Sequence, residues 1–307
     1  MKKLDFHVHI INEISIEESV FYFKDLCRRK GYVGVGIMAA SYATGESHPN
    51  CNEQALAVRA EIPNSYAFAS LHHDRDFVEQ AKQYMEQGFE GIKLLEGKPT
   101  LYRHYGYGFE HPRYEPFFAY AEEHRIPLLI HNNDPIEHWD ITKMSERAIR
   151  KGWYYDETFP NQEHFFRVLE QDVLGKHPNL CVALAHFGFY STDLNRADAL
   201  MQKHPNLMMD ATPALNIYDE LSRTPERTRE FFLKYHDRIL FGTDAENLLV
   251  GEALDLNERK TALLQAFYEG DKPFTLGRHS VVGMHFDKDL LEEIYYYNAL
   301  RFMGLQA

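Results

Sequence analysis

The sequence is poor in cysteine. Its three cysteines, Cys27, Cys51 and Cys181, are widely spaced and form no C-x-x-C pair. Disulfide frameworks usually show an even set of cysteines, and cysteine zinc sites usually show closely spaced pairs. The pattern therefore argues against both kinds of site, and it favours a reducing, cytoplasmic compartment.

Basic charge, long apolar runs and linker segments are also scarce. The chain of 307 residues has 33 lysines and arginines against 46 aspartates and glutamates, a formal net charge of −13. Nucleic-acid binding depends on clustered basic residues that release counterions, so neither nucleic acid nor an anionic membrane is an expected partner. No apolar run reaches the length of about 18 residues that a membrane span needs. Because no Pro-, Gly- or Ser-rich linker divides the chain, we expect a single domain over residues 1–307.

The sequence instead alternates short apolar runs with segments of helical spacing. Strict alternation of strands and helices is typical of an α/β protein with a parallel sheet. Eight such units predict a closed (β/α)8 TIM barrel, with a doubly wound open sheet as the alternative. The runs, rich in β-branched or aromatic residues, predict strands at Leu4–Ile10, Val33–Ala39, Tyr66–Leu71, Phe89–Leu95, Pro127–Asn132, Cys181–Gly188, Leu207–Thr212 and Arg238–Asp244.

Histidine is abundant, with 17 residues, and two of them share the first predicted strand. Alternation along a strand places His7 and His9 on one face, while Phe6 and Val8 point the other way, towards the helices. In a barrel, the face with the histidines is the interior. Two imidazoles in a confined interior suit a first-row divalent metal, and a hydrogen-bonded pair of core histidines is the alternative.

Three further polar residues stand at the carboxyl ends of other predicted strands. His131 ends the fifth strand, His186 lies late in the sixth, and Asp244 ends the eighth. The carboxyl ends of barrel strands meet at one face, where barrel enzymes place their active sites. The sequence therefore predicts a metal-binding active site at the mouth of the barrel.

In this order, and over nearly the whole chain, these residues resemble the motifs of the amidohydrolase superfamily. The resemblance is closer to its amidohydrolase-related branch, which includes hydrolases and metal-dependent non-oxidative decarboxylases. It implies a distorted TIM barrel with a divalent ion held by His7, His9, His131 and Asp244. It also implies that His186 binds substrate or transfers protons. We expect zinc, with manganese as the alternative, because histidine and carboxylate ligands suit both ions.

Lys93, on the fourth predicted strand, decides how many ions are expected. Two-metal members of the superfamily carry a carboxylated lysine at this place. If Lys93 were carboxylated, His131 and His186 would serve a second ion. We expect one ion, with Lys93 contacting a carboxylate or carbonyl of the substrate.

Other polar residues near the predicted strand ends have weaker claims to a role. Arg113, in the loop after the fourth strand, is expected to clamp a substrate carboxylate. Asp5 could orient a ligand histidine, ligate the ion directly or form a hydrogen bond in the core. His72 and His73 end the third predicted strand, where one of them could line the pocket, and Asp210 at the end of the seventh is a similar case. The long connections 133–161 and 245–285 are expected to shape the pocket or an interface.

The expected function is that of a metal-dependent hydrolase acting on a small carbonyl substrate such as a lactone, an amide or a cyclic acid. A metal would lower the pKa of a bound water, Asp244 would accept its proton, and His186 would steady the developing oxyanion. A decarboxylase acting on a small unsaturated or aromatic acid is the alternative. A metal-free barrel with a binding or scaffold role is a third. The expected partner is a small-molecule substrate, and the aromatic-rich connection 133–161 suggests a homodimer.

Overall fold

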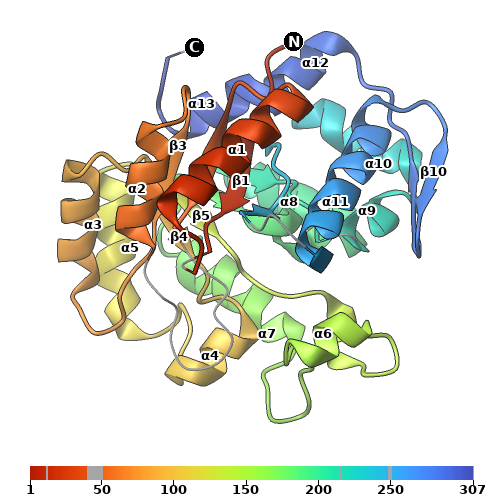
Figure 1. Cartoon of the computed structure of the whole chain (residues 1–307). Coiled ribbons are helices and arrows are strands. Elements are labelled where there is room, and N and C mark those ends of the chain that lie inside the picture. The colour runs from red at the N-terminus through yellow and green to blue at the C-terminus, as the bar shows by residue number, and fades with distance from the viewer. Residues whose placement is uncertain (12, 40–50, 215, 248–250, 307) are drawn as a thin grey trace.

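A parallel sheet that curls into a barrel forms the centre of the molecule (Figure 1). The computed structural model describes residues 1–11, 13–39, 51–214, 216–247 and 251–306, without the side chains of residues 251–253. Within these residues the sheet order is β8-β7-β6-β5-β4-β3-β2-β1-β9. The strands are β1 (Leu4–His9), β2 (Gly34–Met38), β3 (Tyr66–Ala69), β4 (Gly91–Leu94), β5 (Leu128–Ile130), β6 (Val182–Leu184), β7 (Leu207–Asp210), β8 (Ile239–Leu240) and β9 (Ala245–Glu246).

The barrel closes where the eighth predicted strand meets the first. The eighth strand, predicted as Arg238–Asp244, is present only as β8, which pairs with β7. The short strand β9 follows a few residues later and pairs with β1. Between them the Phe6 N–H donates to the Phe241 carbonyl (3.0 Å) and the Asp244 N–H donates to the His7 carbonyl (2.8 Å). At Gly242 a Cβ atom would lie 2.7 Å from the Cβ of His7, so only glycine allows this approach. The predicted distorted (β/α)8 barrel is confirmed.

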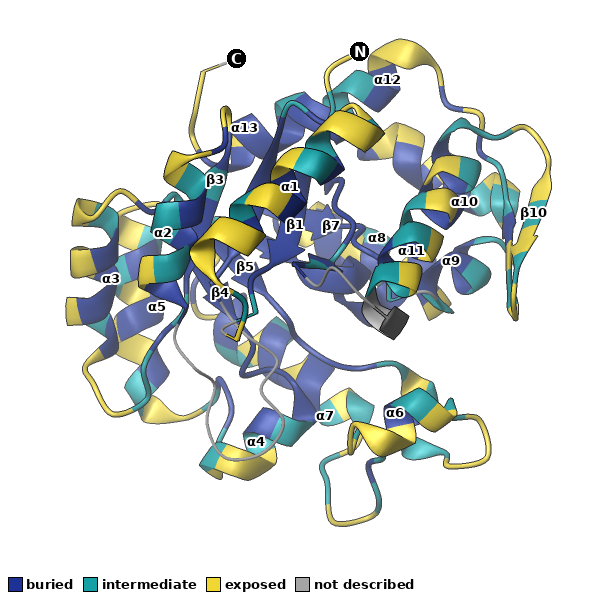
Figure 2. Cartoon of the chain, in the orientation of Figure 1, coloured by how far each residue is buried: buried dark blue, intermediate teal, exposed yellow. Residues whose placement is uncertain are grey.

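Helices cover the outside of the sheet, with exposed outer faces and buried inner faces (Figure 2). Local signals set several of their ends: Ser15 and Glu18 form a capping box, and Gly31 ends the helix with φ of 72°. The helices are α1 (Ile16–Lys30), α2 (Asn52–Ala60), α3 (Phe77–Glu86), α4 (Pro99–Tyr105), α5 (Glu115–Glu123), α6 (Glu146–Arg150), α7 (Gln162–Arg167), α8 (Leu194–Lys203), α9 (Asn216–Leu221), α10 (Pro225–Lys234), α11 (Gly251–Glu269), α12 (Lys288–Glu292) and α13 (Asn298–Phe302).

All eight strands are shorter than predicted, and two of these differences affect the site. The fifth ends at Ile130, so His131 lies just beyond it. The sixth ends at Leu184 instead of Gly188, because residues 186–189 turn into the left-handed region, with φ between 55° and 61°. A strand cannot continue through such a turn, and the turn brings the His186 side chain back over the end of the barrel.

The two long connections carry secondary structure of their own. Residues 133–161 include η2 (Ile136–Trp139) and α6, and they project from the barrel at the bottom of Figure 1. Residues 245–285 include β9, α11 and an antiparallel hairpin of β10 (Pro273–Leu276) and β11 (His279–Val282), although residues 248–250 lie outside the described part. None of the described helices offers an apolar stretch long enough to cross a membrane.

Candidate metal centre

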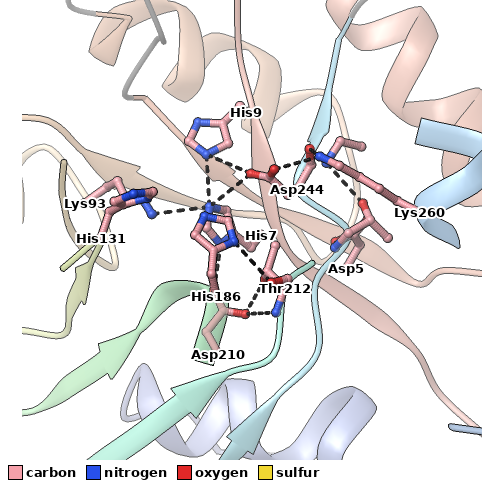
Figure 3. A network of polar contacts seen from close by, with 12 residues as sticks. Asp5, His7, His9, Lys93, His131, His186, Asp210, Thr212, Asp244 and Lys260 are labelled. Atoms are coloured by element: carbon pink, nitrogen blue, oxygen red, sulfur yellow. Dashed lines mark hydrogen bonds and ion pairs between the residues drawn. The ribbon is translucent and has the colours of Figure 1, made fainter. Parts of the chain in front are cut away.

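His7 and His9 lie next to each other on β1, as their spacing in the strand predicts. Both side chains are fully buried, and their Nε2 atoms are 3.0 Å apart. Phe6 and Val8, the alternating residues, pack into the hydrophobic core instead. Strand geometry alone therefore places two imidazole nitrogens at one point inside the barrel mouth (Figure 3).

Asp244 reaches the same point from the opposite side of the barrel seam. Its backbone has φ of 55°, an uncommon value for a residue with a side chain, and this turn aims the carboxylate at the two histidines. The Oδ1 atom lies 3.4 Å from His9 Nε2 and 3.9 Å from His7 Nε2. One ligand atom from each of the three residues thus lies within 4.8 Å of the others.

The chemistry of these atoms fits a divalent cation. His7 Nδ1 is 2.6 Å from Asp210 Oδ2, and donation of its proton there leaves a lone pair on Nε2, as in histidine ligands that a carboxylate orients. Asp244 Oδ1 is buried and has no hydrogen-bond partner among the described residues. The Nε2 lone pair of His7 and the unpartnered oxygen of Asp244 are donor atoms of the kind that divalent metals bind.

Burial favours the neutral form of three histidines at the site, His7, His131 and His186. It lowers the pKa of His7 and of His186 well below the ordinary value, and it lowers the pKa of His131 to about 4. Burial acts in the opposite sense on Asp244, but the Lys260 ammonium outweighs it and holds the pKa of this carboxyl below its usual range. Neutral imidazoles and an ionised carboxylate are the states in which these groups bind metals.

His131 and His186 lie beside this centre. The His131 ring is 5.0 Å from the His186 ring, and both residues line the cavity described below. His186 Nδ1 is 3.1 Å from the Thr212 carbonyl, whereas His131 Nε2 is 3.2 Å from Asp134 Oδ1. His131 is not part of the group within 4.8 Å that the described residues form, and its role as a ligand stays a prediction.

Lys93 extends from β4 into the centre. Its side chain is buried, and Nζ lies 3.4 Å from His7 Nε2. Burial lowers the pKa of Lys93 to about 8, although Asp210 and Asp244 partly oppose the shift. A lysine whose amine deprotonates near neutral pH can contact an ion or become carboxylated, so the number of ions stays open to measurement.

Asp5 and Arg113 point away from the cation position. Asp5 accepts hydrogen bonds from the backbone N–H (2.9 Å) and hydroxyl (2.6 Å) of Thr243, so it anchors the chain next to Asp244. Arg113 donates to the Tyr107 hydroxyl (2.5 Å) and the Arg75 carbonyl (3.1 Å), and it is absent from the described lining of the cavity. Its predicted contact with substrate has no support in this geometry.

Two lysine–aspartate pairs at the site have no counterpart in the sequence predictions. Lys98 donates to both oxygens of Asp134 (2.6 and 2.7 Å), and the Tyr155 hydroxyl donates to the same carboxylate. Lys260, on α11, donates to Asp244. Asp134 follows His131 by three residues, which is the only sequence signal that could have pointed to it.

A cavity of about 640 Å³ opens above the metal centre. His131, His186 and Asp244 line its floor, while the connection 133–161 and the turn of the β10–β11 hairpin line its rim. The charged residues in the lining are Lys98, Arg147, Lys151, Arg259, Lys260 and Arg278 against Asp134, Asp244, Glu246 and Asp255. Cations thus outnumber carboxylates here, although the whole chain has a net charge of −13.

Three of these cations are uncompensated. Lys98, Lys260 and Arg259 pair with carboxylates at 2.6 to 2.8 Å. Arg147, Lys151 and Arg278 form no ion pair with a described residue. Arg147 instead lies over the ring of Trp153, with 5.7 Å between the guanidinium carbon and the ring centre. The rim therefore offers positive charge to a molecule that enters the cavity.

Known structures share this fold at low sequence identity. An uncharacterized TIM-barrel protein from Bordetella bronchiseptica is 16% identical, with a TM-score of 0.60 over 99% of each chain. The 2,6-dihydroxybenzoate decarboxylase from Rhizobium is 15% identical, with a TM-score of 0.54 over 99% of each chain. Dihydroorotase from Campylobacter jejuni is 12% identical, with a TM-score of 0.55 over 100% of this chain and 84% of its own. No curated protein matches the sequence.

The sequence itself matches a family whose members are metal-dependent enzymes. The model of this family, described as amidohydrolase, covers residues 29–305. The match and the barrel confirm the resemblance seen in the sequence motifs. This chain therefore belongs to the amidohydrolase family.

Proposed function

We propose that the protein is a metal-dependent hydrolase of a small carbonyl compound that carries a carboxylate. The observation that carries the proposal is the convergence of His7, His9 and Asp244 within 4.8 Å beneath an open cavity. A divalent ion bound there, with zinc as the first candidate and manganese as the second, would polarise a carbonyl and lower the pKa of water. Each residue around it then has a distinct task.

Asp244 and His186 are placed to handle protons and charge. Asp244 lines the cavity, and its Oδ1 has no hydrogen-bond partner among the described residues. With one lone pair on the ion, Oδ1 could use the other to accept a proton from water and pass it to the leaving group. His186 is neutral because of burial, and its Nδ1 faces the Thr212 carbonyl at 3.1 Å. That hydrogen bond fixes the proton on Nδ1 and orients the ring, whose other nitrogen can meet a developing oxyanion.

The uncompensated cations of the rim support the choice of an anionic substrate. Arg147, Lys151 and Arg278 come from two separate rim segments, so an anion between them would be attracted from both sides. Lys93, whose Nζ lies 3.4 Å from His7 Nε2, would meet a carbonyl or carboxylate only where the substrate reaches the ion itself. A neutral substrate would leave the rim charges unused.

The same cationic lining also favours a second candidate, a decarboxylase of a small unsaturated or aromatic acid. In that reaction the centre would bind the substrate carboxylate, and no attacking water would be needed. Decarboxylases and a dihydroorotase both share the fold, so the fold does not separate the two reactions.

The experiment that tests the proposal combines elemental analysis with two substrate panels. We expect the purified chain to contain a divalent ion, to lose activity on chelation and to regain it with zinc or manganese. Base consumption with lactones that bear a carboxylate, or release of a primary amine from cyclic amides that bear one, would support the hydrolase. Carbon dioxide release from unsaturated acids would support the decarboxylase. A chain that holds no divalent ion, even after reconstitution, would refute both.

A further inference from the structure

Lys260 reaches the candidate metal centre from the outer helix α11. Its side chain is buried, and Nζ donates hydrogen bonds to both the backbone carbonyl and Oδ2 of Asp244, each at 2.7 Å (Figure 3). Two hydrogen bonds from one ammonium to the same residue fix the side-chain rotation of that residue. Lys260 thus determines the direction in which the Asp244 carboxylate points.

The two oxygens of Asp244 consequently have different surroundings. Oδ2 is held by Lys260, whereas Oδ1 has no hydrogen-bond partner among the described residues and lies 3.4 Å from His9 Nε2. Only Oδ1 is therefore available to a cation beside the histidines. The Lys260 ammonium occupies one lone pair of Oδ2, and its positive charge repels a cation from the other.

The helix that carries Lys260 is itself anchored to the same segment. Asn257, one turn earlier on α11, donates to the Glu246 carbonyl (2.9 Å) and to the Tyr22 hydroxyl (2.7 Å). Residues three apart on a helix share a face, so Asn257 and Lys260 hold residues 244–246 at two points. This double attachment makes α11 a rigid support for the carboxylate.

We propose that Lys260 is a positioning residue that holds Oδ2 of Asp244 and leaves Oδ1 as the single carboxylate oxygen for the divalent ion. The inference rests on the proposed metal centre. A catalytic metal site needs an open coordination position, and a carboxylate that binds through both oxygens would fill it. The lysine therefore preserves the position at which substrate or water is accepted.

The test uses the full-length protein reconstituted with Co²⁺. Lys260→Met keeps the length of the side chain and removes the ammonium, so Oδ2 becomes free to bind the ion as well. We expect weaker visible absorption bands, because a higher coordination number lowers their intensity, and weaker binding of azide to the ion. Lys260→Arg, which retains the charge and the donors, should stay closer to the wild type in both measurements.

Lys234→Met is the matched control. Lys234, on α10, pairs with Asp198 on α8, with 2.6 Å between Nζ and Oδ1, and neither residue belongs to the centre. It should leave the spectrum and the azide affinity unchanged. If wild type itself shows no cobalt bands, the metal centre is refuted. If wild type binds cobalt and folded Lys260→Met gives the same spectrum and azide affinity, only the role of Lys260 is refuted.

A second measurement does not depend on the folding of a variant. X-ray absorption spectroscopy of the wild-type cobalt protein distinguishes a carboxylate bound through one oxygen from one bound through two, by the distance from the metal to the carboxylate carbon. The inference predicts one oxygen. Coordination through both oxygens would overturn it.

Discussion

Two buried lysine–aspartate pairs line the cavity, and they differ in whether both carboxylate oxygens of the aspartate have hydrogen-bond partners. Asp134 gives both carboxylate oxygens to partners, with Lys98 on both of them, His131 on one and Tyr155 on the other. Asp244 gives one oxygen to Lys260 and keeps the other free. A carboxylate with both oxygens hydrogen-bonded is typical of a structural role, whereas a carboxylate with one unpartnered oxygen beside two imidazole nitrogens can accept a cation. Within one cavity, Asp134 is thus expected to stabilise the fold and Asp244 to bind the metal.

The largest effect is expected from breaking the satisfied pair. Asp134→Ala leaves the Lys98 ammonium buried without a counter-charge, and such a loss costs about 3–5 kcal/mol of the free energy of unfolding. Guanidinium denaturation at pH 7 measures it. Glu79→Gln, at an exposed pair with Lys82, is the control and should cost about 0.5 kcal/mol or less. An unchanged unfolding midpoint for Asp134→Ala would contradict the structural role.

Breaking the half-satisfied pair should act on metal binding instead. Asp244→Asn keeps the shape of the side chain but removes the charge that faces the cation. Because partners of metal ligands alone are worth about 10–100-fold in affinity, loss of a ligand should cost more than about 100-fold. Competition with a chromophoric chelator measures the affinity. If this variant still bound one ion per chain tightly, Asp244 would not be a metal ligand.

The comparison also shows what could be predicted from the sequence. Strand periodicity is enough to place His7 beside His9, because alternation fixes side-chain direction without any knowledge of the fold. Asp244 and His186 could be assigned to the barrel mouth because each closes an apolar run. Eight such runs were enough for the barrel itself.

Lys260, Asp134 and β9 could not be predicted for a physical reason. Asp244 was expected to end the eighth strand, but its positive φ turns the chain and lets Ala245 and Glu246 pair with β1. The partner lysine of Asp244 lies 16 residues further on a helix, and only the closed barrel brings the two together. Contacts of this kind depend on tertiary geometry, which leaves no local pattern in the sequence.

A third buried carboxyl, which is held by a hydroxyl and not by a lysine, sharpens the comparison. Glu220 accepts a hydrogen bond from Ser191, and burial raises the pKa of Glu220 from 4.5 to about 7. A raised pKa means that the folded protein favours the protonated form. The stability that the protonated Glu220 contributes to the fold is complete below about pH 4.5 and is lost as the pH rises through about 7.

Glu220→Gln should therefore stabilise the protein at pH 8 by about 3 kcal/mol and have little effect at pH 4.5. Thermal unfolding of variant and wild type at both values measures this difference. Equal differences in melting temperature at the two pH values would show that the fold does not raise the pKa of Glu220.

The smallest effect is expected at the cavity rim. Arg147 is partly exposed, so its attraction for an anion is screened by solvent. Arg147→Met should weaken binding of benzoate, a simple aromatic carboxylate, by about fivefold or less, as for exposed ion pairs. Calorimetric titration measures this affinity, and Arg28→Met, at an exposed pair with Asp25 on α1, is the control. Equal benzoate affinities for wild type and Arg147→Met would show that Arg147 does not contribute to anion binding.

Anomalous X-ray diffraction at the absorption edge of the bound metal tests the central claim most directly. The structure predicts an anomalous peak about 2.0–2.2 Å from His7 Nε2, His9 Nε2 and Asp244 Oδ1. A second peak bridged through Lys93 would mean two ions and a carboxylated lysine. Crystals grown with zinc or manganese that show no peak between His7, His9 and Asp244 would contradict the account.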